Sequence, residues 1–180
     1  MSWLIASWPL AIDIQLRTLN SDDHQAYRQL RLEMLREEPT SFGSDYNSAL
    51  ALSERDFRQR TQYATDKFIV GAFAAADLVG SCGGRRDPDV KRQHIGYIWG
   101  MYLRAQHRGT GAAATMLAAT IEGLTRLPDL ELIQLAVTAG NRSAEQLYLN
   151  AGFQEYGVEH AALKVDGKNY DERLMWLPLR

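Results

Sequence analysis

The middle of the chain places a strand pattern, a glycine turn, a helix pattern and a second strand pattern directly after one another. Residues 94–103 and 130–138 are apolar runs of strand length, and residues 112–124 carry apolar side chains at helical spacing. The turn between the first run and the helix is Arg108-Gly109-Thr110-Gly111. Two strands joined through a helix in one sheet run parallel, with a right-handed crossover. This segment therefore predicts an α/β layer fold with at least one parallel strand pair.

The other strand patterns favour antiparallel pairing. Residues 67–75 and 78–84 are two strand-like runs joined through Ala76 and Asp77, as in a hairpin. Residues 153–165 and 170–177 form a second such pair across the turn at 166–168. We therefore predict a mixed, mostly antiparallel central sheet with helices on both faces and one parallel β-α-β crossover.

Helix signals and a further strand occupy the rest of the chain. Alternating residues at 12–16 predict a half-buried strand, and Asn20 to Asp23 supply cap residues for a helix that stops near Pro39. Ser53 can cap a second helix to about residue 63. Asn141 can cap a short helix to about residue 151, with Gly152 as its left-handed stop.

Composition excludes several classes of protein. The 180 residues include 20 Lys and Arg against 22 Asp and Glu, so no bulk positive charge attracts nucleic acid. Cys82 is the single cysteine, which excludes an internal disulfide and a Cys-rich zinc site. The histidines His24, His107 and His160 lack metal-ligand spacing, so no metal is expected.

The hydropathy pattern gives no membrane span and no export signal. No stretch approaches the roughly 18 apolar residues that a span needs. The apolar start, residues 1–12, has no Lys or Arg and so lacks the charged region of a secretory signal. We expect a cytoplasmic protein with one domain over residues 12–180 and an appendage of uncertain order at 1–11.

The glycine turn has the features of an anion site. The first backbone N–H groups of a helix lack internal partners, and the helix dipole places positive potential there. Arg104, His107 and Arg108 precede the helix, where cations oppose the dipole unless something negative lies between them. Gly109 and Gly111 allow a ligand to approach the backbone closely. The alternative is a plain strand-to-helix turn.

A dinucleotide is one candidate anion, but the pattern disfavours it. Residues 109–114 fit G-x-G-x-x-A, and Glu131 follows about 20 residues later. Glu131 begins the next strand, however, whereas a ribose-binding acid belongs at the strand's end. The chain also has only one crossover and no nucleotide P-loop motif.

Two motifs resemble those of the GNAT superfamily of acyl-CoA-dependent N-acyltransferases. The first is [Gln/Arg]-x-x-Gly-x-[Gly/Ala], present at residues 106–111 and again, in overlapping register, at 108–113. The second is N-x-x-A-x-x-L-Y-x-x-x-G-F, present at residues 141–153 and much the more specific of the two. The resemblance extends from about Ile12 to Leu177 and implies a single N-acetyltransferase domain with acetyl-CoA as co-substrate.

The resemblance also implies positions for acetyl-CoA. Loop N–H groups would hold the pyrophosphate, and the pantetheine would run along the strand end before the loop, where the two parallel strands splay apart. Asn141 and Tyr148 would flank the thioester. The implied binding residues other than Asn141 are Met101, Tyr102, Leu103, Arg108, Gly109, Thr110, Gly111, Ala112 and Ala113.

Aminolysis of a thioester requires a base for the amine, donors for the oxyanion and an acid for the thiolate. A backbone N–H of residues 101–103 can stabilise the oxyanion, and Tyr148 can donate the proton to sulfur. Without the motif, Tyr148 is a core aromatic and Asn141 only a helix cap. Cys82 is more typical of a small buried hydrophobe than of a nucleophile. Four candidates for the base stay open: Glu33, His94, Tyr97 and Glu131.

We therefore expect an enzyme that moves acetyl to a primary amine by direct attack in a ternary complex. A non-catalytic CoA-binding sensor or scaffold of the same fold is the alternative. Residues 38–46 and the last hairpin, with Tyr170, Asp171 and Glu172, are expected to shape a pocket for a small-molecule or peptide amine. A homodimer is compatible with the resemblance, but no residue specifies one.

Overall fold

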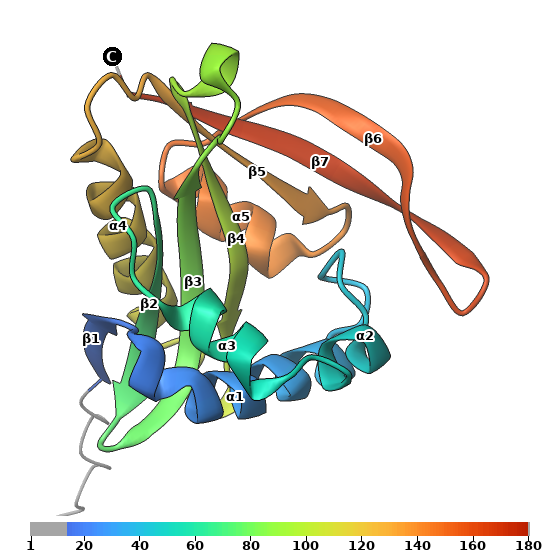
Figure 1. Ribbon diagram of the computed structural model, residues 1–180. Coiled ribbons are helices and arrows are strands. Elements are labelled where there is room, and N and C mark those ends of the chain that lie inside the picture. The colour runs from blue at the N-terminus through green and yellow to red at the C-terminus, as the bar shows by residue number, and fades with distance from the viewer. Residues whose placement is uncertain (1–13, 180) are drawn as a thin grey trace, which may run out of the picture.

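Seven strands form one sheet in the order β1-β2-β3-β4-β5-β7-β6. The computed structural model describes residues 14–179. Figure 1 shows the sheet with its long β6–β7 hairpin projecting from one side. The strands are β1 (Ile14–Thr18), β2 (Lys67–Ala74), β3 (Asp77–Arg86), β4 (Ile95–Leu103), β5 (Leu132–Thr138), β6 (Gln154–Val165) and β7 (Lys168–Pro178).

The predicted parallel crossover is present between β4 and β5. Its pairing covers only Ile95, Gly96 and Tyr97 against Leu132, Ile133 and Gln134. The other neighbouring strands in the sheet pair antiparallel. The predicted fold class, a mixed and mostly antiparallel sheet with one β-α-β crossover, is therefore confirmed.

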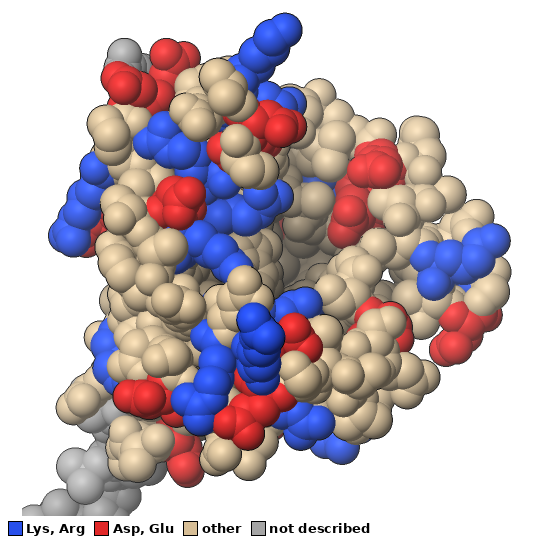
Figure 2. Space-filling view, viewed as in Figure 1, with Lys and Arg blue, Asp and Glu red and all other residues tan. Residues whose placement is uncertain are grey.

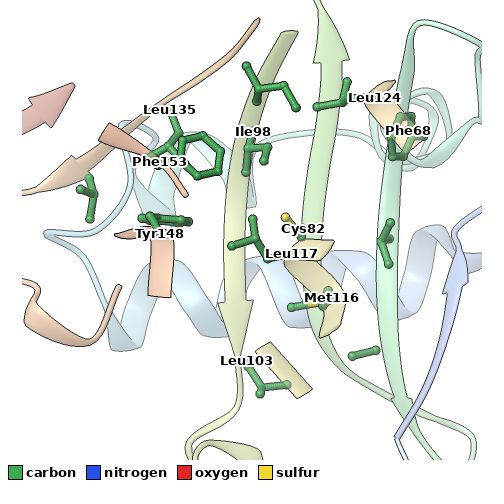
Figure 3. Close-up of a cluster of buried hydrophobic side chains, with 14 of the residues drawn as sticks. Phe68, Cys82, Ile98, Leu103, Met116, Leu117, Leu124, Leu135, Tyr148 and Phe153 are labelled. Atoms are coloured by element: carbon green, nitrogen blue, oxygen red, sulfur yellow. The ribbon is translucent and has the colours of Figure 1, made fainter. Parts of the chain in front are cut away.

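Helices cover both faces of the sheet, as predicted. On one face Met116, Leu117 and Tyr148 pack with strand residues such as Ile133 and Leu135, and Figure 3 shows this core. On the other face Leu30, Met34 and Phe57 pack against Ile69 and Tyr102. The α-helices are α1 (His24–Glu37), α2 (Tyr46–Leu50), α3 (Glu54–Thr61), α4 (Ala112–Thr125) and α5 (Arg142–Asn150).

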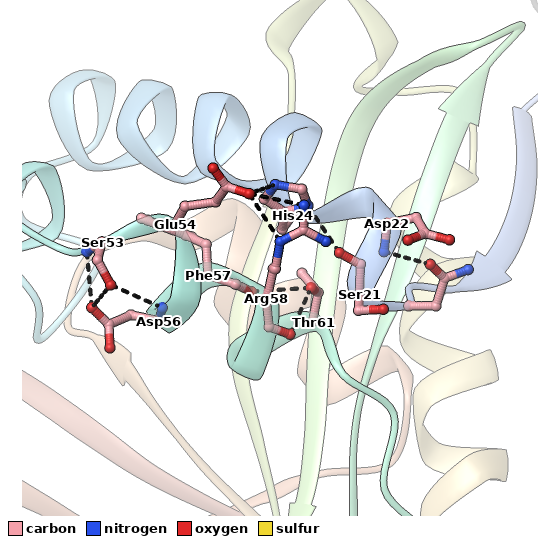
Figure 4. Close-up of polar contacts among 10 residues, drawn as sticks. Ser21, Asp22, His24, Ser53, Glu54, Asp56, Phe57, Arg58 and Thr61 are labelled. Carbon is pink, nitrogen blue, oxygen red and sulfur yellow. Dashed lines mark hydrogen bonds and ion pairs between the residues drawn. The ribbon is translucent and has the colours of Figure 1, made fainter.

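Polar contacts hold α1 against α3, and Figure 4 shows them. His24 lies at the start of α1, and its Nε2 is 3.2 Å from a carboxylate oxygen of Glu54 in α3. Arg58, one turn further along α3, bonds the same carboxylate. Ser53 and Asp56 form the predicted cap of α3, with Ser53 Oγ accepting from the Asp56 amide. The His24–Glu54 contact links α1 to α3 on this face of the sheet.

Some element boundaries differ from the sequence prediction. The strand predicted at 12–16 is described from Ile14 and continues to Thr18, while its first two residues and the appendage at 1–11 lie outside the described residues. α2 was not predicted, because its five residues show no helical period, although Asp45 caps it by accepting from the Ser48 amide. The first hairpin turns at Ala75 and Ala76 instead of Ala76 and Asp77, since Ala75 takes the positive φ of 52°.

A bulge interrupts β4 just before its last residues. Ser81 and Gly83 of β3 pair with Tyr102 and Trp99, so β4 uses one residue more than β3 over this stretch. Gly100 lies in the bulge with φ +62°, and its carbonyl accepts from Ser81 Oγ at 3.3 Å. The bulge changes the direction of β4 and so contributes to its divergence from β5.

Candidate active site

A cleft of about 630 Å³ opens where β4 and β5 diverge. Figure 2 shows the surface hollowed between the α1–α2 layer and the β6–β7 hairpin. Its walls come from the α1–α2 loop, the end of β4, the start of α4 and the turn between β5 and α5. The lining residues are Glu38, Thr40, Ser41, Phe42, Met101, Tyr102, Leu103, Arg108, Gly109, Ala113, Thr138, Ala139, Gly140, Asn141, Ser143, Ala144, Leu147 and Tyr170.

The cleft lies between strands with unused hydrogen-bonding edges. Beyond Tyr97 of β4 and Gln134 of β5, no pairing joins the two strands within residues 14–179. Met101, Tyr102 and Leu103 of β4 form one wall, and Thr138 at the end of β5 forms part of the other. Extended backbone in such a position can pair with an extended ligand. This wedge matches the position that the resemblance implies for pantetheine.

The glycine turn ends at the first residue of α4 without a side-chain cap. Gly109 and Gly111 have φ of +76° and +87°, and a Cβ at either would meet nothing within 4 Å. Gly109 and Ala113 line the cleft, whereas Thr110, Gly111 and Ala112 do not. The side chain of Thr110 bonds the His107 carbonyl at 2.8 Å, which holds the turn in shape.

Several N–H groups of this turn have no protein acceptor. Among residues 14–179, no hydrogen bond is made by the amides of Gly109, Thr110, Gly111 or Ala113. The Arg108 amide is used internally, since it donates to Ala105 O at 3.1 Å, and the Ala112 amide makes only a 3.4 Å contact with Thr110 Oγ1. Four free donors within five consecutive residues at a helix N-terminus can bind an anion.

The expectation that three cations face an anion at this turn is wrong for two of them. Arg104 forms a bidentate ion pair with Glu33 of α1, at 2.7 Å for each bond. His107 is buried, and its Nδ1 has no hydrogen-bond partner. Arg108 alone lines the cleft, where its Nε donates to Leu103 O at 2.9 Å and its Nη2 lies 3.1 Å from Glu38.

Asn141 caps α5 as predicted, and its amide also faces the α1–α2 loop. The side-chain oxygen accepts from the Ala144 amide at 3.3 Å, and Nδ2 lies 3.5 Å from Ser41 Oγ. Thr138 makes a second link to this loop by donating to Thr40 O at 2.6 Å. These bonds close the α1–α2 loop over one end of the cleft.

Tyr148 lies behind the cleft wall in the hydrophobic core. Its side chain is 6% exposed, and its ring packs edge-on against Phe153 at 5.9 Å between centroids. Ala144 and Leu147 of the same helix line the cleft, but Tyr148 does not. Burial raises the pKa of the Tyr148 phenol, with a smaller contribution from nearby Cys82. The phenol therefore stays protonated at neutral pH and keeps a proton to donate.

Cys82 is buried as expected. Burial raises the pKa of its thiol to about 12, which leaves almost no thiolate at neutral pH. The thiol is therefore unsuited to form an acyl-enzyme.

None of the four candidate bases lines the cleft. Glu33 accepts both bonds from Arg104, which lowers its pKa. The Tyr97 hydroxyl accepts from Arg92. His94 and Glu131 precede β4 and β5, and the Glu131 amide bonds the His94 carbonyl at 2.8 Å, at the paired end of the two strands. This end lies away from the divergence that forms the cleft.

The acceptor side of the cleft matches the expected segments in part. The α1–α2 loop contributes four residues and the last hairpin contributes Tyr170. Asp171 instead bonds the Ala161 amide at 2.8 Å and stabilises a bulge in β6. Glu172 lies in β7, where its backbone is paired with Thr138 of β5 on one side and with Glu159 of β6 on the other. Burial, followed by the charge of Glu159, raises the pKa of Glu172.

Six cleft residues were missed by the sequence prediction, of which Ser143, Ala144 and Leu147 belong to α5 and the other three precede it. Thr138, Ala139 and Gly140 connect β5 to α5, just before the motif that begins at Asn141. Their only signal was adjacency to that motif.

No group of three or more metal-ligating side chains occurs within residues 14–179. No helix in the same range has the length and hydropathy to cross a bilayer.

The family model described as the acetyltransferase (GNAT) family matches residues 27–153. This match covers well over half of the chain. The chain belongs to the GNAT acetyltransferase family. The GNAT match includes the wedge between β4 and β5, the glycine turn and the segment from Asn141 to Phe153.

Solved GNAT structures share this fold at low sequence identity. An acetyltransferase of the GNAT family from Streptococcus pneumoniae is 20% identical, with a TM-score of 0.79 over 93% of this chain and all of that one. A putative acetyltransferase, yncA, from Salmonella typhimurium with its cofactor acetyl-CoA is 13% identical, with a TM-score of 0.79 over 93% and 95%. Arabidopsis thaliana NAA60 in complex with a bisubstrate analogue is 16% identical, with a TM-score of 0.72 over 93% and 100%. The comparison with curated proteins gave no match.

Proposed function

We propose that this GNAT protein transfers acetyl from acetyl-CoA to a primary amine by direct attack within a ternary complex. The wedge between β4 and β5, continued by the uncapped glycine turn, carries this proposal. It offers backbone pairing for an extended chain and free N–H groups for a diphosphate in one continuous cleft. The yncA structure holds acetyl-CoA in a protein of the same fold, which is consistent with this use.

The proposed contacts follow the cleft from the turn to the wedge. The free amides of Gly109, Thr110, Gly111 and Ala113 bind the pyrophosphate, helped by the positive end of α4. The side chain of Arg108 lies at the same wall, paired with the half-exposed Glu38, and is the one cation among the described residues that line the cleft. The pantetheine then follows Met101, Tyr102 and Leu103 along β4.

The reaction forms a C–N bond and breaks a C–S bond. The amine nitrogen attacks the thioester carbonyl, and a backbone N–H near Met101 stabilises the oxyanion. Collapse expels the thiolate, which takes a proton from Tyr148, while the amine gives up its own proton to water or a base. The raised pKa of Tyr148 makes the phenol a weaker acid but keeps it protonated at neutral pH, so its O–H is present to hydrogen-bond the leaving sulfur and to donate the proton. Asn141 contacts the donor through Nδ2, beside Ser41.

A screen of amines tests the activity. The protein is incubated with acetyl-CoA and a panel of amino acids, polyamines, aromatic amines and peptides, and products are identified by mass spectrometry. An acetylated amine with an equal amount of free CoA is expected. Tight CoA binding in a calorimeter without any acetylated product would favour the sensor or scaffold instead. Light scattering or ultracentrifugation tests whether the protein forms a homodimer.

A further inference from the structure

Arg31 is a buried arginine without an acidic partner. It lies in the middle of α1 on the face toward the sheet, and it is 5% exposed. Its Nε has no hydrogen-bond partner, and its Nη1 contacts only the sulfur of Met34, at 3.8 Å. None of the ion pairs within residues 14–179 includes Arg31.

Several arginines that are more exposed than Arg31 have carboxylate partners. Arg104, which is more exposed than Arg31, has Glu33, and Arg17 and Arg92 have Asp23 and Asp87. A guanidinium stays charged in proteins, so burying one without an anion is unfavourable. Burial lowers the pKa of Arg31; the nearby Tyr27 opposes this, and the positive charge of Arg60 adds to it. An anion bound at Arg31 would offset the cost of burying its charge.

The guanidinium lies beside the acceptor side of the cleft. Its centre is 5.4 Å from the ring of Phe42, a half-buried residue of the α1–α2 loop that lines the cleft. Its Nη1 is 3.9 Å from the place a Cβ on Gly100 would occupy, which puts it next to the β4 bulge. Met101, the next residue, lines the same cleft. Phe42 therefore separates the guanidinium from the cleft, beside the strand that is proposed to hold the thioester.

We propose that Arg31 binds the carboxylate of the acceptor, which makes the substrate class a small amino acid with a free amine and a free carboxylate. This inference rests on the proposed N-acetyltransferase function. A carboxylate matches the planar fork of a guanidinium and can satisfy two of its N–H groups. The ring of Phe42 moves aside to admit it. With the carboxylate on Arg31, the amine of a small molecule is held near the bulge at Gly100 and Met101.

Free amino acids and their amides test this inference. The structures of each pair differ only at the carboxylate, which the amide replaces with a neutral group. Amidation also lowers the pKa of the amine, so at a given pH the amides have more of the reactive free base, which works against the expected preference for acids. With the wild-type protein we expect kcat/KM for the acids to exceed that for the amides by roughly tenfold or more. Arg31→Met should lower kcat/KM for the acids by roughly 10- to 100-fold, mainly through KM, and leave the amides within about threefold.

Two variants control for charge and for the helix. Arg31→Lys should keep part of the preference for acids, because it retains the charge but not the fork. Arg36→Met removes an exposed arginine from the same helix and should change neither substrate class. Equal use of acids and amides by the wild type, or an equal loss of both in Arg31→Met, would overturn the inference while leaving the acetyltransferase proposal intact.

A binding measurement separates the two proposals when no product forms. Thermal unfolding of the CoA complex is recorded with each amino acid and each amide, in the wild type and in Arg31→Met. A rise in Tm with acids that only the wild type shows supports the carboxylate site even if the protein fails to acetylate. Equal shifts in both proteins, or no shift with any acid, overturn it.

Discussion

Arg104 and Glu33 form a bidentate ion pair that joins the loop after β4 to α1, with both nitrogen–oxygen distances at 2.7 Å. The Tyr102 hydroxyl donates its proton to Glu37 at 2.7 Å, and its oxygen also lies 3.3 Å from the Glu33 carboxylate. This network connects α1 to the strand that lines the cleft. Arg104 therefore positions the wall of the cleft instead of binding the anion at the glycine turn.

Glu33→Gln should destabilise the protein in a pH-dependent way. The hydrogen bonds from Arg104 lower the pKa of Glu33, so its stabilisation is complete above the unfolded carboxyl pKa of roughly 4.3 and is lost as pH falls through the lower folded value. We expect the variant to lose about 1 kcal/mol of unfolding free energy at pH 7. The difference from the wild type should shrink below pH 4 in urea titrations. A difference that stays constant down to pH 3 would contradict this assignment.

Gly109→Ala should weaken acetyl-CoA binding more than it weakens the fold. Gly109 has φ +76° in open space, so the variant adds backbone strain of about 1–2 kcal/mol and a methyl group at the proposed pyrophosphate site. Gly167→Ala at the tip of the last hairpin is the matched control, with φ +77° and equally open surroundings. Both should lose similar stability in thermal melts. Only Gly109→Ala should raise the KM for acetyl-CoA, by roughly tenfold. Equal changes of KM in the two variants would show that the glycine turn does not bind acetyl-CoA.

Tyr148→Phe should lower kcat by roughly 100-fold or more in a thiol-release assay, because general acids contribute factors of this size. The raised pKa keeps Tyr148 protonated through pH 6–9, so its loss should lower the rate by the same factor at every pH in this range. Tyr63→Phe, at a residue 58% exposed, should behave as the wild type. Full turnover by Tyr148→Phe would leave Tyr148 as a core aromatic only.

Arg31→Met should leave the fold as stable as the wild type or make it more stable. Replacing a buried, unpaired charge with an apolar chain of similar length removes a desolvation cost without leaving a partner behind. We expect the unfolding free energy to rise by up to about 2 kcal/mol, measured by chemical denaturation without acceptor. A loss of several kcal/mol would indicate that Arg31 serves the packing of α1.

The sequence predicted those parts of the fold and site that depend on local chemistry. The strand and helix periods, the Asn141 cap, the left-handed stop at Gly152 and the two glycines before α4 need only neighbouring residues to be recognised. The order of these elements then gave the crossover between β4 and β5. These predictions succeeded because the residues that determine a cap, a positive φ or a hydrophobic period lie within a few positions of one another in the sequence.

Long-range partners were outside the reach of that reasoning. Arg104 and Glu33 are 71 positions apart, and Thr138 and Thr40 are 98 apart, so no spacing rule pairs them. The burial of Arg31 depends on the path of α1 across the sheet, and its period alone gave no sign of it. The positions of His94 and Glu131 depended on how far the parallel pairing extends, which is three residues.

β4 and β5 are hydrogen-bonded to each other at one end only, and the rest of their facing edges is left open to a ligand. Past Tyr97 and Gln134, the facing edges of β4 and β5 have no strand between them within residues 14–179, and water can exchange with the amide protons on these edges in the free protein. A molecule that enters the wedge completes the sheet by supplying the missing edge. Amide exchange should therefore slow along β4 and at the glycine turn together when CoA is added, as one cooperative unit reaching from the core to the surface.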